Sequence, residues 1–252
     1  MNSYKKASDL RNSAKNLLDG KYKNAVLITV LCTLVINMAS LFIQNISTNT
    51  LNTVYYSTQS LAAYNVVAVI FDIIMVAVNI LLGIMNAGLA LFYLNIACKQ
   101  DFKVSDLFYA YKNDSKKALG ISAAVIGLQS VCLLPAQYLL TGYLNNQSEQ
   151  WLFYTIIALI IGVVVYVPVS LHIALAFYLM FDFPQYSALE TLKLSRKLMK
   201  GHCLRLFCLQ LSFVPLMILC LFSLGIGFLW LQPYMQMTQV LFFLDLMNPE
   251  EK

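Results

Sequence analysis

The sequence predicts an all-α fold, a polytopic membrane helical bundle of six transmembrane helices with short amphipathic surface helices before each hairpin. Three observations favour this class. Hydrophobic residues make up 60% of the 252 positions and charged residues 12%, whereas an ordinary soluble domain carries about 25% charged residues. Apolar runs long enough to cross a bilayer recur along the chain. The basic residues sit at the ends of these runs.

Six apolar runs have roughly the 20 residues that a helix needs to cross the hydrocarbon core of a membrane. They cover residues 24–45, 65–97, 119–140, 151–181, 204–224 and 228–246. We treat residues 1–252 as a single integral membrane domain. The last run is the least regular, because Pro233 and three glutamines interrupt it. After a turn at Gly225–Gly227 it either crosses back or stays near the outer surface.

The 17 Lys and Arg residues predict the orientation. They precede the first span, lie between the second and third or between the fourth and fifth, or end the chain. The other connections, 46–64 and 141–150, contain no Lys or Arg. Short loops rich in these residues stay in the cytoplasm. We therefore expect the amino-terminal segment 1–23 and the basic collars 98–118 and 182–203 to be cytoplasmic.

The three basic segments resemble one another, which predicts a possible threefold internal repeat. Each starts at a serine suited to capping a helix and runs to a glycine near the next span. The pairs are Ser8 and Gly20, Ser105 and Gly120, and Ser187 and Gly201. Ser187 with Glu190 also makes a capping box. Three units of one surface helix and one hairpin would return the carboxyl end to the cytoplasm.

The second collar is predicted to lie in the membrane plane as an amphipathic helix. Its apolar residues, Leu189, Leu192, Leu194, Leu198 and Met199, tend to one side and would enter the acyl boundary. Its basic residues, Lys193, Arg196, Lys197 and Lys200, spread round the other side and would contact anionic lipid headgroups. A binding site for an acidic partner is the alternative.

Polar residues inside apolar runs are functional candidates, because lipid disfavours them. The candidates for a polar pathway are Asp72, Asn79, Asn86 and His172, with Gln129 and Gln137 as further lining residues. Each has a structural alternative. Counting about 20 residues back from Ala97 places Asp72 in the outer interface. Asn79 and Asn86 suit close helix packing, and His172 suits a hydrogen-bonded packing role.

The motifs of common enzymes and metal sites are absent. We find no HExxH, no GxSxG, no phosphate-binding glycine loop with its Lys and no Cys/His metal spacing. We therefore expect no enzymatic activity and no cofactor. The six cysteines include no CxxC pair and are interpreted as small buried hydrophobes. The net charge of +5 does not indicate nucleic acid, since the bases sit at span ends.

The last third of the chain carries a family resemblance. "ALETLKLSRKLMKGHCLRLFCLQLSF" and "LGIGFLWLQPY" resemble the signature of the domain of unknown function 975 family of bacterial integral membrane proteins, found mainly in Firmicutes. The matching positions are Ala188, Leu192, Ser195, Arg196, Met199, Gly201, Phe207, Leu211, Ser212, Phe213, Gly225, Gly227, Pro233 and Tyr234. Weaker agreement comes from Arg11, Ala14, Lys15, Gly20 and Tyr22, and from Ser105 to Phe108.

The chain departs from the family pattern at two places. Pro168 is followed by Val169 rather than by the family's Gly, and Phe242 and Phe243 stand where a Phe-Tyr pair is common. The resemblance implies a location in the bacterial cytoplasmic membrane. It implies no activity, because the family has none to carry over.

Two functions remain open. The first is a non-enzymatic membrane module that interacts with membrane lipids or with partner membrane proteins, including further copies of itself. The alternative is a small-molecule permease or transporter component, which predicts a mid-membrane cavity lined by several of the polar candidates. Prolines in each of the last four spans favour kinked helices, which often build transporter sites. A membrane enzyme acting on lipid is a third alternative.

Overall fold

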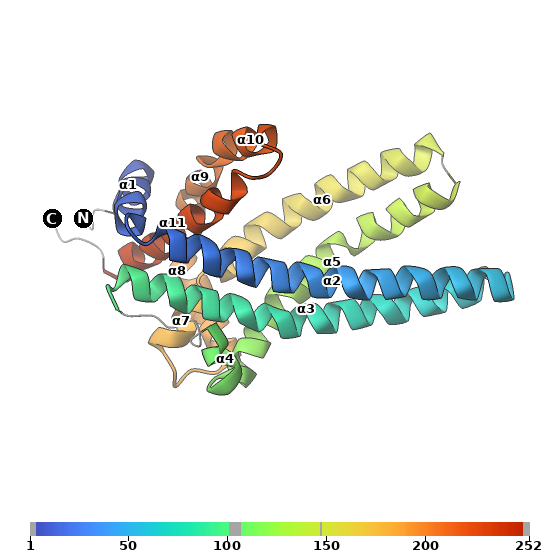
Figure 1. Ribbon diagram of the computed structural model, residues 1–252, viewed down its shortest axis with the longest axis horizontal. Coiled ribbons are helices and arrows are strands. Elements are labelled where there is room, and N and C mark those ends of the chain that lie inside the picture. Colours follow the sequence, from blue (N-terminus) through green and yellow to red (C-terminus); the bar gives the residue numbers. More distant parts are fainter. Residues whose placement is uncertain (1–3, 101–106, 147, 249–252) are drawn as a thin grey trace.

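The computed structural model describes residues 4–100, 107–146 and 148–248, and over these ranges the prediction of an all-helical fold is confirmed. Two long helical hairpins dominate the molecule (Figure 1). The first joins α2 (Tyr22–Thr58) to α3 (Leu61–Ala97), and the second joins α5 (Ser115–Asn146) to α6 (Glu149–Ile173). The two hairpins leave a common base and diverge toward their tips (Figure 1).

Shorter helices gather around this base. They are α1 (Ala7–Leu18), α4 (Tyr109–Lys112), α7 (Ala176–Asp182), α8 (Ala188–Met199), α9 (Cys203–Leu211), α10 (Val214–Phe222) and α11 (Phe228–Met247). The main apolar core lies here, with Tyr93, Met199 and Phe243 among its fully buried members. The hydroxyls of Thr29 and Tyr93 lie 2.5 Å apart and join α2 to α3 inside it. The base is therefore packed, and the hairpins extend from it as arms.

In both long hairpins the helices extend further, and the connections between them are shorter, than the sequence predicts. Most of the predicted connection 46–64 is helical because α2 continues to Thr58, and α5 continues to Asn146 within the predicted connection 141–150. At 1.5 Å per residue the 37 residues of α2 make a rod of about 55 Å, whereas the hydrocarbon core is about 30 Å thick. The first hairpin is thus long enough to extend well beyond a bilayer.

Side-chain hydroxyls in the polar segment at the end of α2 bond to backbone carbonyls of the same helix. Thr48 donates a hydrogen bond to the carbonyl of Gln44, Thr50 to that of Ile46, and Thr58 to that of Val54. Each bond spans four residues and replaces a water contact of the hydroxyl without breaking the helix. The turn itself contains only Gln59, with φ of 47°, and Ser60, whose hydroxyl accepts from the amide of Ala63.

Within the described residues, five segments are long and apolar enough to cross a membrane. They are Tyr22–Thr58, Ala62–Ala97, Ser115–Tyr143, Glu149–Asp182 and Cys203–Phe222. Multi-pass membrane embedding follows from these five. The helix α11, which covers the sixth predicted span at 228–246, is not one of them. Pro135, Pro168 and Pro233 lie inside helices, while Pro215 lies in the first turn of α10.

The third hairpin, formed by α9, α10 and α11, is shallow. Its turn between α10 and α11 lies much nearer the base than the tips of the other two hairpins do (Figure 1). Leu229 and Trp230, just after this turn, line a groove with Tyr22 and Val30 from the first turns of α2. This hairpin therefore reaches less far from the base than the other two, although its segment Cys203–Phe222 is long and apolar enough to cross a membrane.

The amphipathic helices α1 and α8 pack on the protein. Leu10, Ala14 and Leu18 of α1 are buried, and α1 lies against α11. On α8, Met199 is buried and Leu194 packs against the same core, so the prediction that its apolar side enters the acyl boundary is wrong. Leu189 alone among the predicted apolar residues is largely exposed, at 70%. Protein neighbours, invisible in the sequence, take the place expected of lipid.

The predicted caps are met in part. Ser187 caps α8, and its capping box with Glu190 is confirmed. Ser8 does not cap α1, because Lys6 holds the N-cap position, and Ser105 lies outside the described residues. Gly20 and Gly201 form the turns before α2 and α9 with φ of 73° and 88°.

Gly120 differs from the other two glycines of the proposed repeat. It lies inside α5, where a Cβ would come within 2.6 Å of the Cβ of Ala188 on α8. Its role is therefore a close helix contact and not a turn. The middle unit of the predicted repeat does not share this feature with the outer two.

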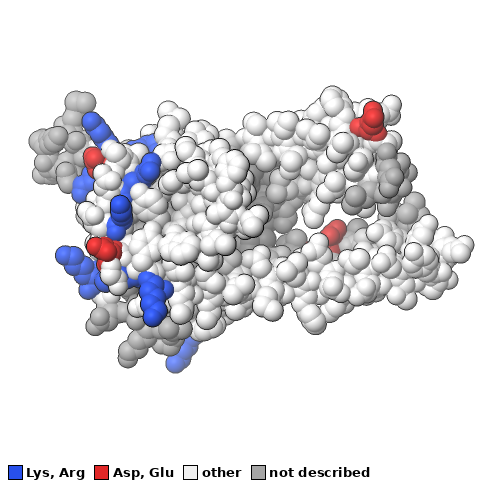
Figure 2. All heavy atoms as spheres, turned by 45° about the horizontal axis from the view of Figure 1, so that its top comes forward, with Lys and Arg blue, Asp and Glu red and all other residues white. Residues whose placement is uncertain are grey.

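Charge separates the two ends of the molecule. Lys and Arg side chains gather at the base, where both termini lie (Figures 1 and 2). The far part of the same face is almost entirely uncharged (Figure 2). We call the first the basic end and the second the tip end.

Candidate ligand-binding cleft

The two long hairpins touch where α3 crosses α5. Gly83 makes this contact possible, because a Cβ there would come within 2.9 Å of Ile126 and 3.1 Å of the Ser122 hydroxyl. Toward the tip end the hairpins separate (Figure 1). The separation leaves a cleft of about 710 Å³ lined by α2, α3, α5 and α6. The space-filling view shows a hollow between the two arms (Figure 2).

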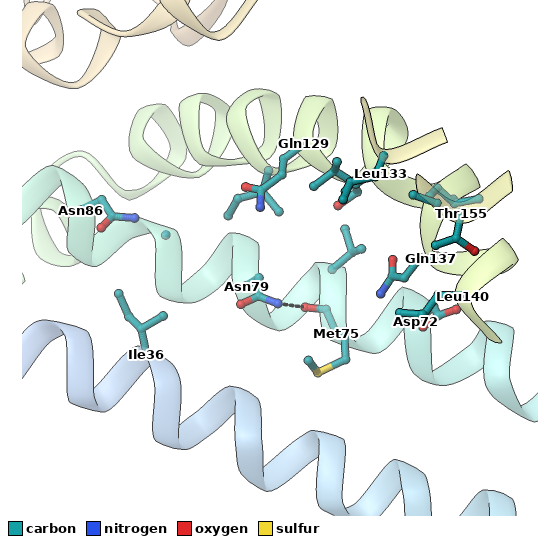
Figure 3. A pocket seen from close by; sticks show the side chains of 17 residues that line it. Ile36, Asp72, Met75, Asn79, Asn86, Gln129, Leu133, Gln137, Leu140 and Thr155 are labelled. Carbon is teal, nitrogen blue, oxygen red and sulfur yellow. Dashed lines mark hydrogen bonds between the residues drawn. The ribbon is translucent and has the colours of Figure 1, made fainter. Parts of the chain in front are cut away.

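The cleft has a polar stripe on each of its main walls. Asp72, Asn79 and Asn86 line it from α3 at intervals of seven residues, which is about two helical turns and keeps them on one face. Gln129 and Gln137 line it from α5. In the close view Gln137 lies near Asp72, and Gln129 faces the wall that carries Asn79 (Figure 3). Ser130 and Thr155 add hydroxyls.

Most of these polar groups lack a protein partner. Two of them have partners: Asn79 Nδ2 donates to the Met75 carbonyl at 2.9 Å and its Oδ1 accepts from the Ser40 hydroxyl at 3.2 Å, and the Thr155 hydroxyl donates to the Trp151 carbonyl at 2.8 Å. Within the described part of the chain, the side chains of Asp72, Gln129 and Gln137 have no hydrogen-bond partner. An amide left without a partner in an apolar medium costs roughly 2–7 kcal/mol. These groups therefore require water or a ligand.

The only charged side chain among the described residues that line the cleft is acidic. Asp72 is a carboxylate, and neither Lys nor Arg is among the described residues that line the cleft. The remaining polar groups are carboxamides and hydroxyls, which donate and accept without charge. Such a cleft attracts cations, accommodates neutral hydrogen-bonding groups and disfavours anions.

Comparison with known proteins places the chain in a family. The family model described as "Protein of unknown function (DUF975)" matches residues 1–250. The chain belongs to the DUF975 family. This confirms the resemblance carried by the last third of the sequence. No curated protein and no solved structure matches the chain.

Several positions that carry the DUF975 resemblance have structural roles at the base. Ser195 is buried on α8 and donates a hydrogen bond of 2.9 Å to the carbonyl of His172, which ties α8 to α6. The rings of Phe213 and Tyr234 meet edge to face with centroids 5.2 Å apart. Gly225 takes a φ of 86° in the turn of the third hairpin. The family signature therefore maintains the base and this hairpin.

One predicted pathway residue of the DUF975 chain lies elsewhere. His172 does not line the cleft. Its Nδ1 lies 2.7 Å from the Pro168 carbonyl, one turn earlier in its own helix. The packing alternative applies to His172, whereas Asp72, Asn79 and Asn86 come together with both predicted glutamines. Ser130 and Thr155 went unpredicted, because single hydroxyls are too common in apolar helices to stand out.

The four bases of the second collar remain at the surface. Lys193, Arg196, Lys197 and Lys200 are all exposed on α8. None of the four forms an ion pair with another described residue. Their charge is thus available to a partner outside the chain.

The cysteines follow the sequence interpretation in part. Cys32 and Cys220 are buried, as expected, but Cys98 and Cys208 are exposed. Cys98 ends α3 at the basic end, where packing gives way to a connection. Across the described ranges, no group of three or more His, Cys, Asp or Glu side chains could hold a metal ion.

Proposed function

We propose that this protein binds a small neutral or cationic amphiphile in the cleft, as a permease or transporter component of the bacterial cytoplasmic membrane. The observation that carries this proposal is the meeting of five polar side chains, from two helices, in one cleft. Asp72, Asn79, Asn86, Gln129 and Gln137 share that space of about 710 Å³. A cavity of this size accommodates a small organic ligand.

The orientation is part of the proposal. Loops rich in Lys and Arg remain in the cytoplasm, so the basic end with both termini faces the cell interior. The cleft then opens toward the outer side, because the hairpins diverge away from the basic end (Figure 1). A ligand would enter from outside or from the outer leaflet, and its apolar part would meet leucines such as Leu133 and Leu140.

Cysteine accessibility tests the cleft directly. In a variant with all native cysteines replaced, Gln137→Cys should react with charged, membrane-impermeant thiosulfonates added from outside. Val131→Cys is the matched control, because Val131 lies on the same helix but is 72% exposed on the apolar surface. Lipid should protect it. A Gln137→Cys variant as unreactive as Val131→Cys would end the proposal of a water-filled cleft.

Reagent charge tests the role of Asp72. A carboxylate beside the reacting thiol should favour a cationic thiosulfonate over an anionic one by roughly tenfold. In Gln137→Cys this preference should fall toward unity when Asp72→Asn is added. An unchanged ratio would show that Asp72 does not set the selectivity of the cleft, and the cationic part of the proposal would fail.

A second candidate function rests on the four exposed bases of α8. A non-enzymatic module that holds anionic lipid at the basic end needs unpaired cations at the surface, and α8 supplies them. Each base near an anionic surface contributes about 1 kcal/mol. The quadruple change of Lys193, Arg196, Lys197 and Lys200 to Gln should therefore reduce the anionic lipid that copurifies with the protein. Unchanged lipid content would exclude α8 as the contact.

The non-enzymatic module could also bind partner membrane proteins or further copies of the chain. We propose no catalytic step and no cofactor for either function. The two candidates differ in location, because the cleft lies toward the tip end and the bases lie at the opposite end. A variant that loses one property and keeps the other separates them.

A further inference from the structure

A second, apolar groove runs between α2 and the turn of the third hairpin. One part, of about 560 Å³, is lined by Val26, Leu27 and Val30 of α2 and by Leu229 of α11. An adjoining part, of about 300 Å³, is lined by residues of α10 and α11. Tyr22 and Trp230 line both parts, so the two form one continuous groove along the hairpin.

The turn beside this groove has the properties of a segment that contacts the hydrocarbon of a membrane. Phe222 and Leu224 are 83% and 93% exposed, so the outermost side chains of the hairpin are apolar. The backbone amides of the turn are nonetheless satisfied internally. Gly225 donates to the Cys220 carbonyl at 3.0 Å, and Gly227 donates to the Ser223 hydroxyl at 2.9 Å.

The neighbouring backbone amides of the turn also donate to acceptors within the hairpin. Those of Leu224, Ile226 and Phe228 donate to carbonyls three residues earlier. A membrane tolerates a backbone turn only where such groups find partners. The turn therefore meets the condition for a hairpin that ends inside the bilayer, and the groove beside it would then lie in the half of the membrane next to the basic end.

The opposite end of the groove carries positive charge. Lys23 lines the groove itself and is exposed. Tyr234 also lines it, and its hydroxyl accepts a hydrogen bond of 3.4 Å from Nε of Arg11. Arg11 stacks over Phe213 at 5.3 Å and forms no ion pair with any described residue. Two cations without a carboxylate partner thus stand where an apolar groove meets the membrane surface.

We propose that this groove holds one acyl chain of an anionic phospholipid whose phosphate lies near Lys23 and the Arg11–Tyr234 pair. The apolar walls of the groove exclude a polar ligand. Charge complementarity selects an anionic headgroup over a zwitterionic one. The site is separate from the polar cleft, so the proposal does not depend on that function.

Tryptophan quenching tests this proposal with the full protein. The chain has two tryptophans, and Trp151→Phe leaves Trp230, which lines the groove, as the only one. Brominated phospholipid quenches a tryptophan that its chains touch. In mixed micelles, brominated phosphatidylglycerol should displace an unbrominated lipid from Trp230 several-fold more effectively than brominated phosphatidylcholine does.

Charge variants supply the decisive comparison. Lys23→Gln and Arg11→Gln should each reduce this preference about fivefold, the value expected for one base near a membrane surface. Lys112→Gln is the matched control, because Lys112 is an exposed base of α4 that does not line the groove, and this change should leave the preference unchanged. Arg11→Lys keeps the positive charge. If the charge binds the headgroup, this variant should retain most of the preference for the anionic lipid.

Other outcomes would overturn the proposal. Equal quenching by the two brominated lipids would show no headgroup site. A loss of preference in Lys112→Gln equal to that in Lys23→Gln would show general surface attraction only. Weak quenching by both lipids, together with disulfide-linked dimers of Leu229→Cys, would show that a second copy of the chain occupies the groove.

Discussion

Gly88 and Gly127 show how the surroundings of a residue decide its importance. Both are glycines inside helices, which sequence alone cannot distinguish. A Cβ at Gly88 would come within 2.0 Å of the Leu107 carbonyl oxygen, a backbone atom, whereas a Cβ at Gly127 would meet nothing within 4 Å. Gly88 therefore lets the backbone of Leu107 lie directly on α3.

Alanine substitution should separate the two positions. Gly88→Ala forces the backbone apart, and overpacking of this kind costs about 1–3 kcal/mol. Gly127→Ala should be neutral or slightly stabilising, because alanine favours a helix over glycine. Thermal unfolding of the purified protein in detergent measures both. Equal midpoints for the two variants would show that the contact of Gly88 with Leu107 does not hold the connection in place.

Basic residues also differ in ways their sequence pattern hides. All 17 contribute to one charge pattern along the chain, but Lys117 is nearly buried and donates to the carbonyls of Met180 and Phe183 at 3.0 and 2.6 Å. It thereby caps the end of α7. Lys193 and Lys197 remain exposed on α8. Only the folded chain distinguishes a structural cation from an available one.

At the scale of elements, the start of α8 was predictable because a capping box is local. The Ser187 amide donates to a Glu190 carboxylate oxygen at 2.7 Å, and the Ser187 hydroxyl donates to the same oxygen at 2.8 Å. These two bonds, the backbone one first, hold the pKa of Glu190 below its usual value of 4.5. A depressed pKa means that the ionised form stabilises the fold.

The pH dependence follows from this sign. The stabilisation from Glu190 is fully present above the ordinary glutamate pKa and is lost as pH falls through the lowered pKa of the folded state. Glu190→Gln should therefore lower the thermal midpoint at pH 7, and the difference from the parent protein should shrink as pH falls through the lowered pKa of Glu190. In a Ser187→Ala background the same change should have a smaller effect, because only the hydrogen bond from the backbone amide of residue 187 to Glu190 remains. A difference that persists unchanged at low pH would contradict the capping role.

The third hairpin is an element whose depth in the membrane the sequence alone does not decide. Its length and composition suit two spans, but its depth depends on packing against α2 and on internal hydrogen bonds of the turn. Cysteine labelling with an impermeant maleimide tests this in a variant without native cysteines. Leu224→Cys should be labelled neither in intact cells nor in inverted vesicles, because the turn lies in hydrocarbon.

Two further positions calibrate that experiment. Thr58→Cys at the tip of the first hairpin should label from outside, and Lys193→Cys on α8 should label only in inverted vesicles. Outside labelling of Leu224→Cys would show that the hairpin crosses the whole membrane. Inside labelling of Thr58→Cys would reverse the proposed orientation of the molecule.

At the scale of the whole molecule, both ends of the chain are tied together at the base. Arg205 on α9 pairs with Asp245 on α11 and donates a bond of 2.7 Å to the Lys5 carbonyl. Its guanidinium also stacks over Tyr4 and Phe242 at 5.1 and 4.8 Å. The amide of Lys5 donates to Asp245 at 3.3 Å. The amino terminus, α9 and α11 therefore share one charged contact.

Removal of one charge should loosen this contact. Asp245 is only 3% exposed in its side chain, so Asp245→Asn leaves Arg205 partly buried without a counterion. Breaking such a pair costs about 3 kcal/mol, measurable as a shift in unfolding by sodium dodecyl sulfate. Asp9→Asn, an exposed change on α1, should stay within about 0.5 kcal/mol of the parent. Equal stability of the two variants would show that the ion pair does not hold the termini.

The sequence by itself determined that the chain is helical and membrane-embedded. Burying charge in lipid is costly, and most charged residues accordingly lie outside the long apolar runs. It also indicated the polar candidates, since Asp72 and Asn79 stand out against apolar neighbours. Tertiary structure alone decided which of these meet. Asp72 and Gln137 lie on different helices and share a cleft because Gly83 sets where the hairpins touch and separate. His172 instead contacts the Pro168 carbonyl of its own helix. Contacts between distant segments depend on packing geometry, which no local pattern encodes.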